Sequence, residues 1–182
     1  MLLHGARALS QVFLANRTLI RKLVRSSSIG PKDTVLEIGP GTGNITQELV
    51  HVAKHVIGVE IDVRLHQQLK SQNYSNLTLY CMDFLHYRLP HYPYKVFANI
   101  PFSLQGKITR KLLGASNPPT DCYLVLRKDF AYRLGGIHKE GQLSRHYKQW
   151  FNFEITHHFH RNDFAPRTWV RCVLLRIQRN NQ

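Results

Sequence analysis

Short apolar runs alternate with stretches of helical periodicity over the first two thirds of the chain. Nearly continuous hydrophobic runs predict buried strands at residues 34–38, 55–60, 77–81, 95–99 and 122–126. Apolar positions at helical spacing predict helices at about 44–53, around 65–69 and at 108–113. Because strands that alternate with helices are most simply joined in parallel by crossover connections, this pattern predicts an α/β fold with a parallel sheet.

The two ends of the chain add a helix and a hairpin. Asn16 is suited to cap an N-terminal helix with an apolar face formed by Leu19, Ile20, Leu23 and Val24. Residues 153–159 and 170–177 are strand-like and close enough to pair as an antiparallel hairpin. The sequence therefore predicts a mostly parallel seven-stranded sheet with a C-terminal antiparallel hairpin.

The charge balance indicates a polyanionic partner. Among 182 residues, 25 Lys and Arg against 11 Asp and Glu give a formal net charge of +14. No run of apolar residues is long enough for a membrane span. The length favours a single domain over residues 1–182, which we expect to be a monomer. Three cysteines far apart in sequence are typical of reduced thiols, so we expect a cytoplasmic protein.

A basic segment occupies about the first 30 residues, where no acidic residue precedes Asp33. Arg17, Arg21, Lys22 and Arg25 fall largely on the polar face of the predicted first helix, so we expect them to contact phosphates of the polyanionic partner. An organelle transit peptide is the alternative, but a discarded leader would not need the helical pattern.

A glycine loop between a predicted strand and helix indicates a ligand site. Gly39, Gly41 and Gly43 allow close backbone approach, and Glu60 ends the next strand, where a carboxylate can bind both ribose hydroxyls. A dinucleotide fingerprint would place its third glycine at Asn44, so the spacing favours S-adenosylmethionine over NAD. Glu37 suits the cationic amino-acid tail of that cofactor, directly or through water. The alternative is a tight turn without a ligand.

A further carboxylate follows the third strand. Asp83 is placed to accept a hydrogen bond from the adenine amino group of the cofactor. Ligands of open α/β sheets bind at the carboxyl ends of the strands, so three successive strand ends now predict one nucleoside site.

The tetrapeptide at residues 99–102 indicates chemistry on an adenine amino group. The conjugated nitrogen is a poor nucleophile until two acceptors hold its hydrogens, and the Asn99 side chain and the Ile100 carbonyl can supply them. Pro101 fixes the backbone, and Phe102 offers a face on which an extruded base can stack. This predicts direct methyl transfer by positioning and polarisation. The alternative is an ordinary turn after a buried strand.

With these motifs, the chain resembles the rRNA adenine N6-methyltransferases, most closely the Erm group. The matching segments are residues 10–14, 36–43, 59–62, 83–84, 99–102 and 164–166. The resemblance implies a Rossmann-like class I methyltransferase fold and a catalytic loop at Asn99, Ile100, Pro101 and Phe102. The full set of residues expected to bind S-adenosylmethionine, and its product S-adenosyl-L-homocysteine, is Gln11, Phe13, Glu37, Gly39, Gly41, Gly43, Glu60, Ile61, Asp83, Phe84 and Asn99.

The substrate implied by the Erm resemblance is 23S rRNA, whose methylation confers macrolide-lincosamide-streptogramin B resistance. The alternatives are a small-subunit (16S-type) rRNA adenine dimethyltransferase, a noncatalytic nucleic-acid-binding relative and a Rossmann oxidoreductase. Ile100 favours the Erm group, since the small-subunit enzymes usually carry Leu there. The chain departs from the family at Val12, Thr168 and Cys172, and we expect it to lack the family's helical C-terminal domain.

Several other residues have competing interpretations. Lys107, Arg110 and Lys111 follow the tetrapeptide on a predicted helix and are candidates for phosphate contact. We expect Trp150 and Trp169 to pack in the core or cap the hairpin rather than stack on bases. Three histidines at 157–160 lack ligand spacing, so no metal is expected.

Overall fold

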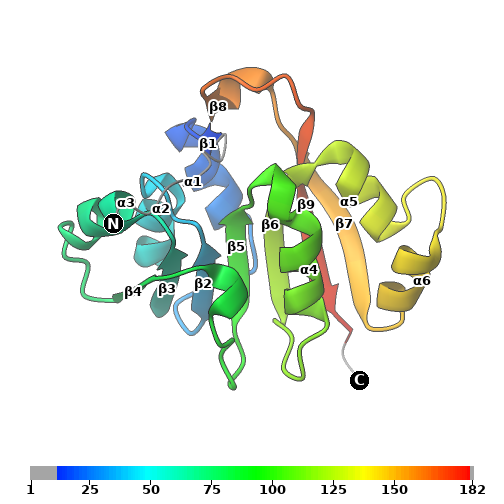
Figure 1. Ribbon diagram of the computed structural model, residues 1–182, viewed down its shortest axis with the longest axis horizontal. Helices are drawn as coiled ribbons and strands as arrows, with labels where there is room; N and C mark the ends of the chain where they lie inside the picture. Colours follow the sequence, from blue (N-terminus) through cyan, green and yellow to red (C-terminus); the bar gives the residue numbers. More distant parts are fainter. Residues whose placement is uncertain (1–11, 181–182) are drawn as a thin grey trace, which may run out of the picture.

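The computed structural model describes residues 12–180 and contains a twisted seven-stranded sheet (Figure 1). The strands lie in the order β4-β3-β2-β5-β6-β9-β7, of which the first five are parallel. β9 runs antiparallel to both β6 and β7. The bounds are β2 Thr34–Ile38, β3 His55–Glu60, β4 Leu77–Cys81, β5 Lys95–Asn99, β6 Asp121–Arg127, β7 Phe151–His158 and β9 Cys172–Arg179. The predicted mostly parallel sheet with a C-terminal antiparallel hairpin is confirmed.

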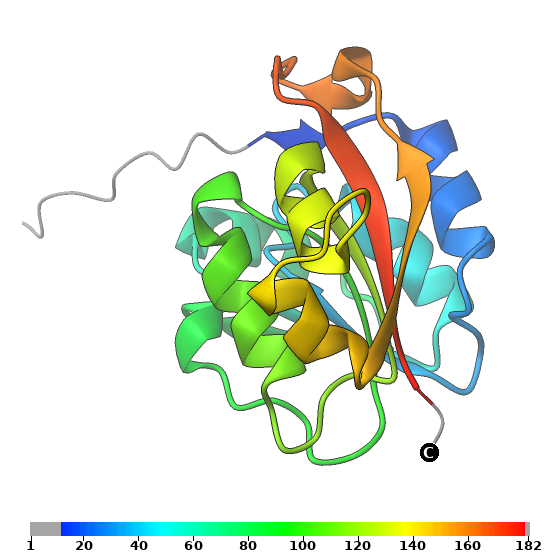
Figure 2. The same ribbon diagram turned by 90° about the vertical axis from the view of Figure 1, so that its right-hand side faces the viewer.

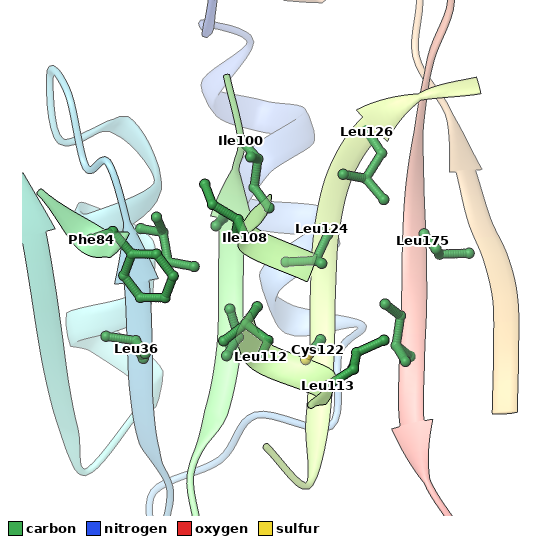
Figure 3. Packing of buried hydrophobic residues seen from close by; sticks show 14 of the residues in the cluster. Leu36, Phe84, Ile100, Ile108, Leu112, Leu113, Cys122, Leu124, Leu126 and Leu175 are labelled. Atoms are coloured by element: carbon green, nitrogen blue, oxygen red, sulfur yellow. The ribbon is translucent and has the colours of Figure 1, made fainter. Parts of the chain in front are cut away.

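Helices cover both faces of the sheet. α1 (Arg17–Arg25) and α2 (Asn44–Val52) bury their apolar residues on one face. α4 (Gln105–Leu113), α5 (Lys128–Gly135) and α6 (Gln142–Lys148) contribute to the core on the other face, where Leu112 and Leu124 lie at the centre (Figure 3). α3 (Val63–Lys70) connects β3 to β4. Both faces of the central strands are therefore buried, which explains their continuous apolar runs.

The first helix forms as its sequence predicts. The Asn16 side chain accepts a hydrogen bond from the Leu19 amide at 3.1 Å and so caps α1. Ile20, Leu23 and Val24 are buried against the sheet. The cationic side chains of α1 remain exposed, as an amphipathic helix on a basic protein requires.

A two-stranded ribbon was not predicted. β1 (Phe13–Leu14) pairs antiparallel with β8 (Phe164–Ala165), which brings the start of the described chain beside its last third. Figures 1 and 2 show this ribbon at one end of the sheet, above the tops of β9 and β7. Short 3₁₀ helices are η1 Phe84–His86, η2 Phe102–Leu104 and η3 Arg161–Asp163.

The expectation that the two tryptophans pack in the core is wrong, whereas their capping of the hairpin stays a prediction. Trp169 is 87% exposed and Trp150 is 50% exposed, so neither is a core residue. Among the residues described, no helix is long and apolar enough to cross a membrane, and no cluster of three potential metal ligands occurs.

Candidate active site

The carboxyl ends of the parallel strands surround a cavity of about 280 Å³. Its walls come from the segments after β2, β3 and β4, from the end of β5 and from β1. The lining residues are Val12, Phe13, Ile38, Gly39, Gly41, Val59, Glu60, Ile61, Met82, Asp83, Phe84, Asn99, Pro101, Leu104 and Ile108. The predicted nucleoside site and the predicted catalytic loop thus face the same space.

The glycine loop lines the cavity, and its conformation requires residues without side chains. Gly39 and Gly41 adopt positive φ values of 64° and 59°. A Cβ atom on Gly41 would lie 2.5 Å from Cε1 of Phe13. The Phe13 ring therefore packs directly on the glycine loop, and only glycine fits at position 41.

Glu60 ties the glycine loop to the end of β3. It is only 2% exposed, and its two carboxylate oxygens accept hydrogen bonds from the amides of Gly41 and Asp62, each at 2.9 Å. A carboxylate has about four acceptor sites, so both oxygens keep capacity for a further donor. Glu60 can hold the loop and receive ribose hydroxyls at the same time.

The region after β4 fits a flat base. Asp83 caps η1 by accepting a hydrogen bond from the Leu85 amide at 2.8 Å on Oδ1, and its other oxygen is 3.8 Å from His86 Nδ1. Val59, Ile61 and Phe84 supply apolar walls beside it. One acceptor among apolar surfaces is the chemistry that recognises an adenine ring and its amino group. The residues present therefore fit the nucleoside part of S-adenosylmethionine.

Glu37 does not line the cavity, so its predicted role toward the cationic tail of the cofactor, directly or through water, stays a prediction. It is 1% exposed, and its Oε2 atom accepts a hydrogen bond from the Thr46 hydroxyl at 2.7 Å. Its Oε1 atom is buried and has no hydrogen-bond partner among residues 12–180. Burial, reinforced by the nearby Glu60 charge and opposed by the Thr46 bond, raises the pKa of the Glu37 carboxyl to about 8. Gly43, the N-cap of α2, also does not line the cavity.

The tetrapeptide presents its first and third residues to the cavity. The Asn99 side-chain nitrogen donates to the Val12 carbonyl at 2.7 Å, which orients the amide and leaves its oxygen as an acceptor. The Ile100 side chain is buried in the core (Figure 3), so only its backbone is available for a chemical role. Phe102 is partly buried against the core and does not line the cavity. Its proposed stacking on a target base therefore remains a prediction.

Sequence reasoning missed much of the apolar lining. The additional lining residues are Val12, Ile38, Val59, Met82, Leu104 and Ile108. Most of them directly flank the polar motif residues in sequence, and this adjacency could have predicted them as lining residues. The predicted contact of Gln11 lies outside the described residues.

Most of the basic residues predicted to contact phosphates are exposed, but one of those on α1 forms an ion pair. Arg17, Lys22 and Arg25 are exposed on α1, whereas Arg21 pairs with Glu48 at 3.2 Å. On α4, the exposed side chains are Lys107 and Arg110.

Lys111 departs from its predicted role in phosphate contact. Its ammonium donates to the carbonyls of Leu85 and Tyr87, at 2.8 and 2.6 Å. Burial lowers the pKa of Lys111, against the opposing effect of Asp83. Lys111 therefore anchors the η1 segment and is not available to a phosphate.

Comparison with known proteins identifies the family to which the chain is similar. The sequence model of the family described as Ribosomal RNA adenine dimethylase matches residues 3–182. The mitochondrial ribosomal RNA small subunit methyltransferase of Arabidopsis thaliana is 40% identical over 129 residues, covering 68% of this chain and 34% of that protein. The rRNA adenine N-6-methyltransferase of Corynebacterium diphtheriae is 33% identical over 180 residues, covering 97% and 69%.

The solved structures of two other proteins are similar to this chain. The 23S rRNA methyltransferase ErmE superposes with a TM-score of 0.87 at 27% identity, over 93% of this chain and 70% of that one. A dimethyladenosine transferase from Plasmodium falciparum has a TM-score of 0.83 at 28% identity, over 92% and 63%. Across these four proteins, the chain spans from 34% to 70% of the relative's length.

Proposed function

Because the chain belongs to the ribosomal RNA adenine dimethylase family, we propose that it transfers methyl groups from S-adenosylmethionine to the N6 atom of an adenine in ribosomal RNA. One observation carries the proposal: Asn99 and Pro101 line the same cavity as Gly41, Glu60 and Asp83. The cavity thereby brings the Asn99 side chain, a candidate acceptor for an amino group, beside residues suited to a nucleoside.

The cofactor would be held by residues from three strand ends. Glu60 would accept hydrogen bonds from the ribose hydroxyls, and Asp83 would accept one from the adenine amino group. Because Gly39 and Gly41 have no side chains, the backbone of the glycine loop could lie close to the cofactor. When bound, S-adenosylmethionine supplies an electrophilic methyl group on a sulfonium. Phe13 covers the glycine loop and excludes water from that side.

The chain's contribution to catalysis is to prepare the target nitrogen. The Asn99 oxygen would accept one hydrogen of the adenine amino group, and the backbone carbonyl of Ile100 would accept the other. Hydrogen bonds from both hydrogens to these acceptors would favour a tetrahedral nitrogen whose lone pair is no longer conjugated with the ring, and the surplus proton of the methylated nitrogen would pass to solvent. Catalysis then relies on orientation and fixed dipoles, without a strong base or a covalent protein intermediate.

Radiolabel transfer to protein-free ribosomal RNA tests the activity. The parent chain should label RNA, whereas Asn99→Ala should bind S-adenosylmethionine in calorimetry but transfer methyl groups at a rate lower by about 100-fold. Absence of label on any RNA despite cofactor binding would favour the noncatalytic nucleic-acid-binding reading. Failure of the parent chain to bind S-adenosylmethionine would overturn the assignment of the cavity as the cofactor site.

Two RNA substrates are candidates. Ile100 and the similarity to ErmE favour 23S rRNA, and expression of the chain should then protect a sensitive host against macrolides. The 40% identical Arabidopsis protein favours small-subunit RNA. We put 23S rRNA first, and parallel labelling of 23S and 16S rRNA distinguishes the two. Label on 16S rRNA alone would reject the 23S substrate.

A further inference from the structure

An exposed tryptophan and an arginine form a cation–π pair in the segment between β7 and β9. Trp169 is 87% exposed, and the Cζ atom of Arg161 lies 5.0 Å from the centroid of its ring. The distance is within the range of a cation–π contact. Because the residue is so exposed, the ring face opposite Arg161 is open to solvent.

The chain on either side of the ring holds it outward. Thr168 is only 6% exposed, and its hydroxyl accepts a hydrogen bond from the Val170 amide at 3.1 Å. Val170 packs against the hydrophobic core. With both neighbours turned inward, the Trp169 side chain is presented to solvent from an anchored backbone.

Arg161 is anchored in the same way. It begins η3, whose last residue, Asp163, is 6% exposed and accepts a hydrogen bond from the His160 amide at 2.8 Å. The Asp163 side chain also accepts from the Asn16 side chain at 2.9 Å, and its carbonyl accepts from the Ala15 amide at 2.7 Å. The arginine side of the pair is therefore attached to the chain that follows β1.

These anchors connect the pair to the cavity wall. Ala165 lies opposite Phe13 in the β1–β8 ribbon, and Phe13 lines the cavity. Figures 1 and 2 show the segment that carries the pair at the same end of the molecule as β1.

The charge of the segment matches RNA. Between residues 161 and 171 the exposed charged side chains are Arg161, Arg167 and Arg171. The acidic side chain in that interval, Asp163, is buried and occupied by the bonds described above. An aromatic face beside one arginine, on a segment with two more exposed arginines, suits an unpaired base and its phosphates, because bases stack on aromatic rings and phosphates attract cations.

We propose that Trp169 and Arg161 form a stacking platform for an unpaired RNA base close to the target adenine. The proposal rests on the proposed function for the identity of the RNA, but the binding it describes needs no methyl transfer. It assigns to the terminal hairpin loop a role in substrate recognition.

Tryptophan fluorescence tests the platform directly. In a Trp150→Phe variant the remaining tryptophan is Trp169, and an oligouridylate of about ten nucleotides should quench its emission. The matched control is Trp169→Phe, which retains Trp150 and should show no quenching. Uridine has no N6 amino group, so this probe does not report on the adenine-specific pocket.

Affinity and salt dependence separate stacking from charge. Trp169→Ala should weaken oligouridylate binding about tenfold without changing the slope of log affinity against log salt. Trp169→Phe should restore part of the loss. Arg161→Gln should lower that slope by about one, because it removes one cation.

The outcomes distinguish the platform from the proposed function. Unchanged affinity in Trp169→Ala, or no quenching in Trp150→Phe, would overturn the platform even if the parent methylates rRNA. Quenching by the oligonucleotide in a protein that methylates no RNA would support the platform and reject the proposed function. Self-association of the parent in sedimentation that Trp169→Ala abolishes, with RNA affinity unchanged, would assign the surface to a second copy of the chain instead.

Discussion

Replacement of Glu37 by glutamine should change how the stability of the protein depends on pH. The Glu37 carboxyl is buried near the end of β2, where one oxygen accepts a hydrogen bond from Thr46 and the other has no partner in the described part of the chain. Burial raises its pKa from 4.5 to about 8. Glutamine keeps the size of the side chain and an oxygen acceptor for Thr46 but cannot ionise.

The sign follows from linkage between protonation and folding. Between pH 4.5 and about 8, the unfolded chain ionises Glu37 while the folded protein keeps the proton. The contribution of this group to the free energy of unfolding is therefore fully present below pH 4.5 and is lost as the pH rises to about 8. Since one pKa unit corresponds to about 1.4 kcal/mol, the loss is at most about 5 kcal/mol.

Urea unfolding of the parent and Glu37→Gln at several pH values between 5 and about 9 measures this loss. The difference between the two proteins cancels the titration of the histidines and should grow in favour of the variant as the pH rises. Glu154→Gln, which removes an exposed carboxyl, is the control and should give a nearly constant difference. A constant difference for Glu37→Gln as well would refute the reasoning that burial keeps Glu37 protonated.

Three further predictions concern the cavity and the basic surface. Gly41→Ala places a Cβ atom against an aromatic ring at positive φ and should cost about 1–3 kcal/mol of stability and weaken cofactor binding in calorimetry, whereas Gly106→Ala in α4 should stabilise by up to about 1 kcal/mol. Lys107→Gln should lower the salt dependence of RNA binding, whereas Lys111→Gln should leave it unchanged and destabilise by about 1–3 kcal/mol in urea. Asp83→Asn keeps an oxygen to cap η1 but should weaken S-adenosylmethionine binding about tenfold, with RNA affinity unchanged; equal cofactor affinity would remove Asp83 from the site.

The central sheet was predictable because its signal is local. Buried parallel strands read as continuous apolar runs, and the motifs at their ends need no knowledge of distant contacts. Gly39, Gly41, Glu60 and Asp83 come together because the carboxyl ends of parallel strands share one edge. Asn99 joins them for the same reason.

The errors concern residues whose surroundings come from elsewhere in the chain. Lys111 has the sequence context of a surface cation, but the η1 segment, about 25 residues earlier, offers it two carbonyls. Trp169 is a large aromatic residue of the kind often found in a core, but the side chains of Thr168 and Val170 point inward and that of Trp169 is exposed. Periodicity within one segment cannot reveal either arrangement, because the deciding partners are tertiary.

β1 shows how much of the site depends on such tertiary contacts. A two-residue strand has little stability of its own, so its position must be imposed by its neighbours. Asn99 binds the Val12 carbonyl on one side, and Asp163 binds Ala15 and Asn16 on the other. The catalytic loop and the terminal hairpin therefore hold the same short strand, whose aromatic ring covers the glycine loop. The proposed cofactor site and the proposed RNA surface thus depend on the same short strand.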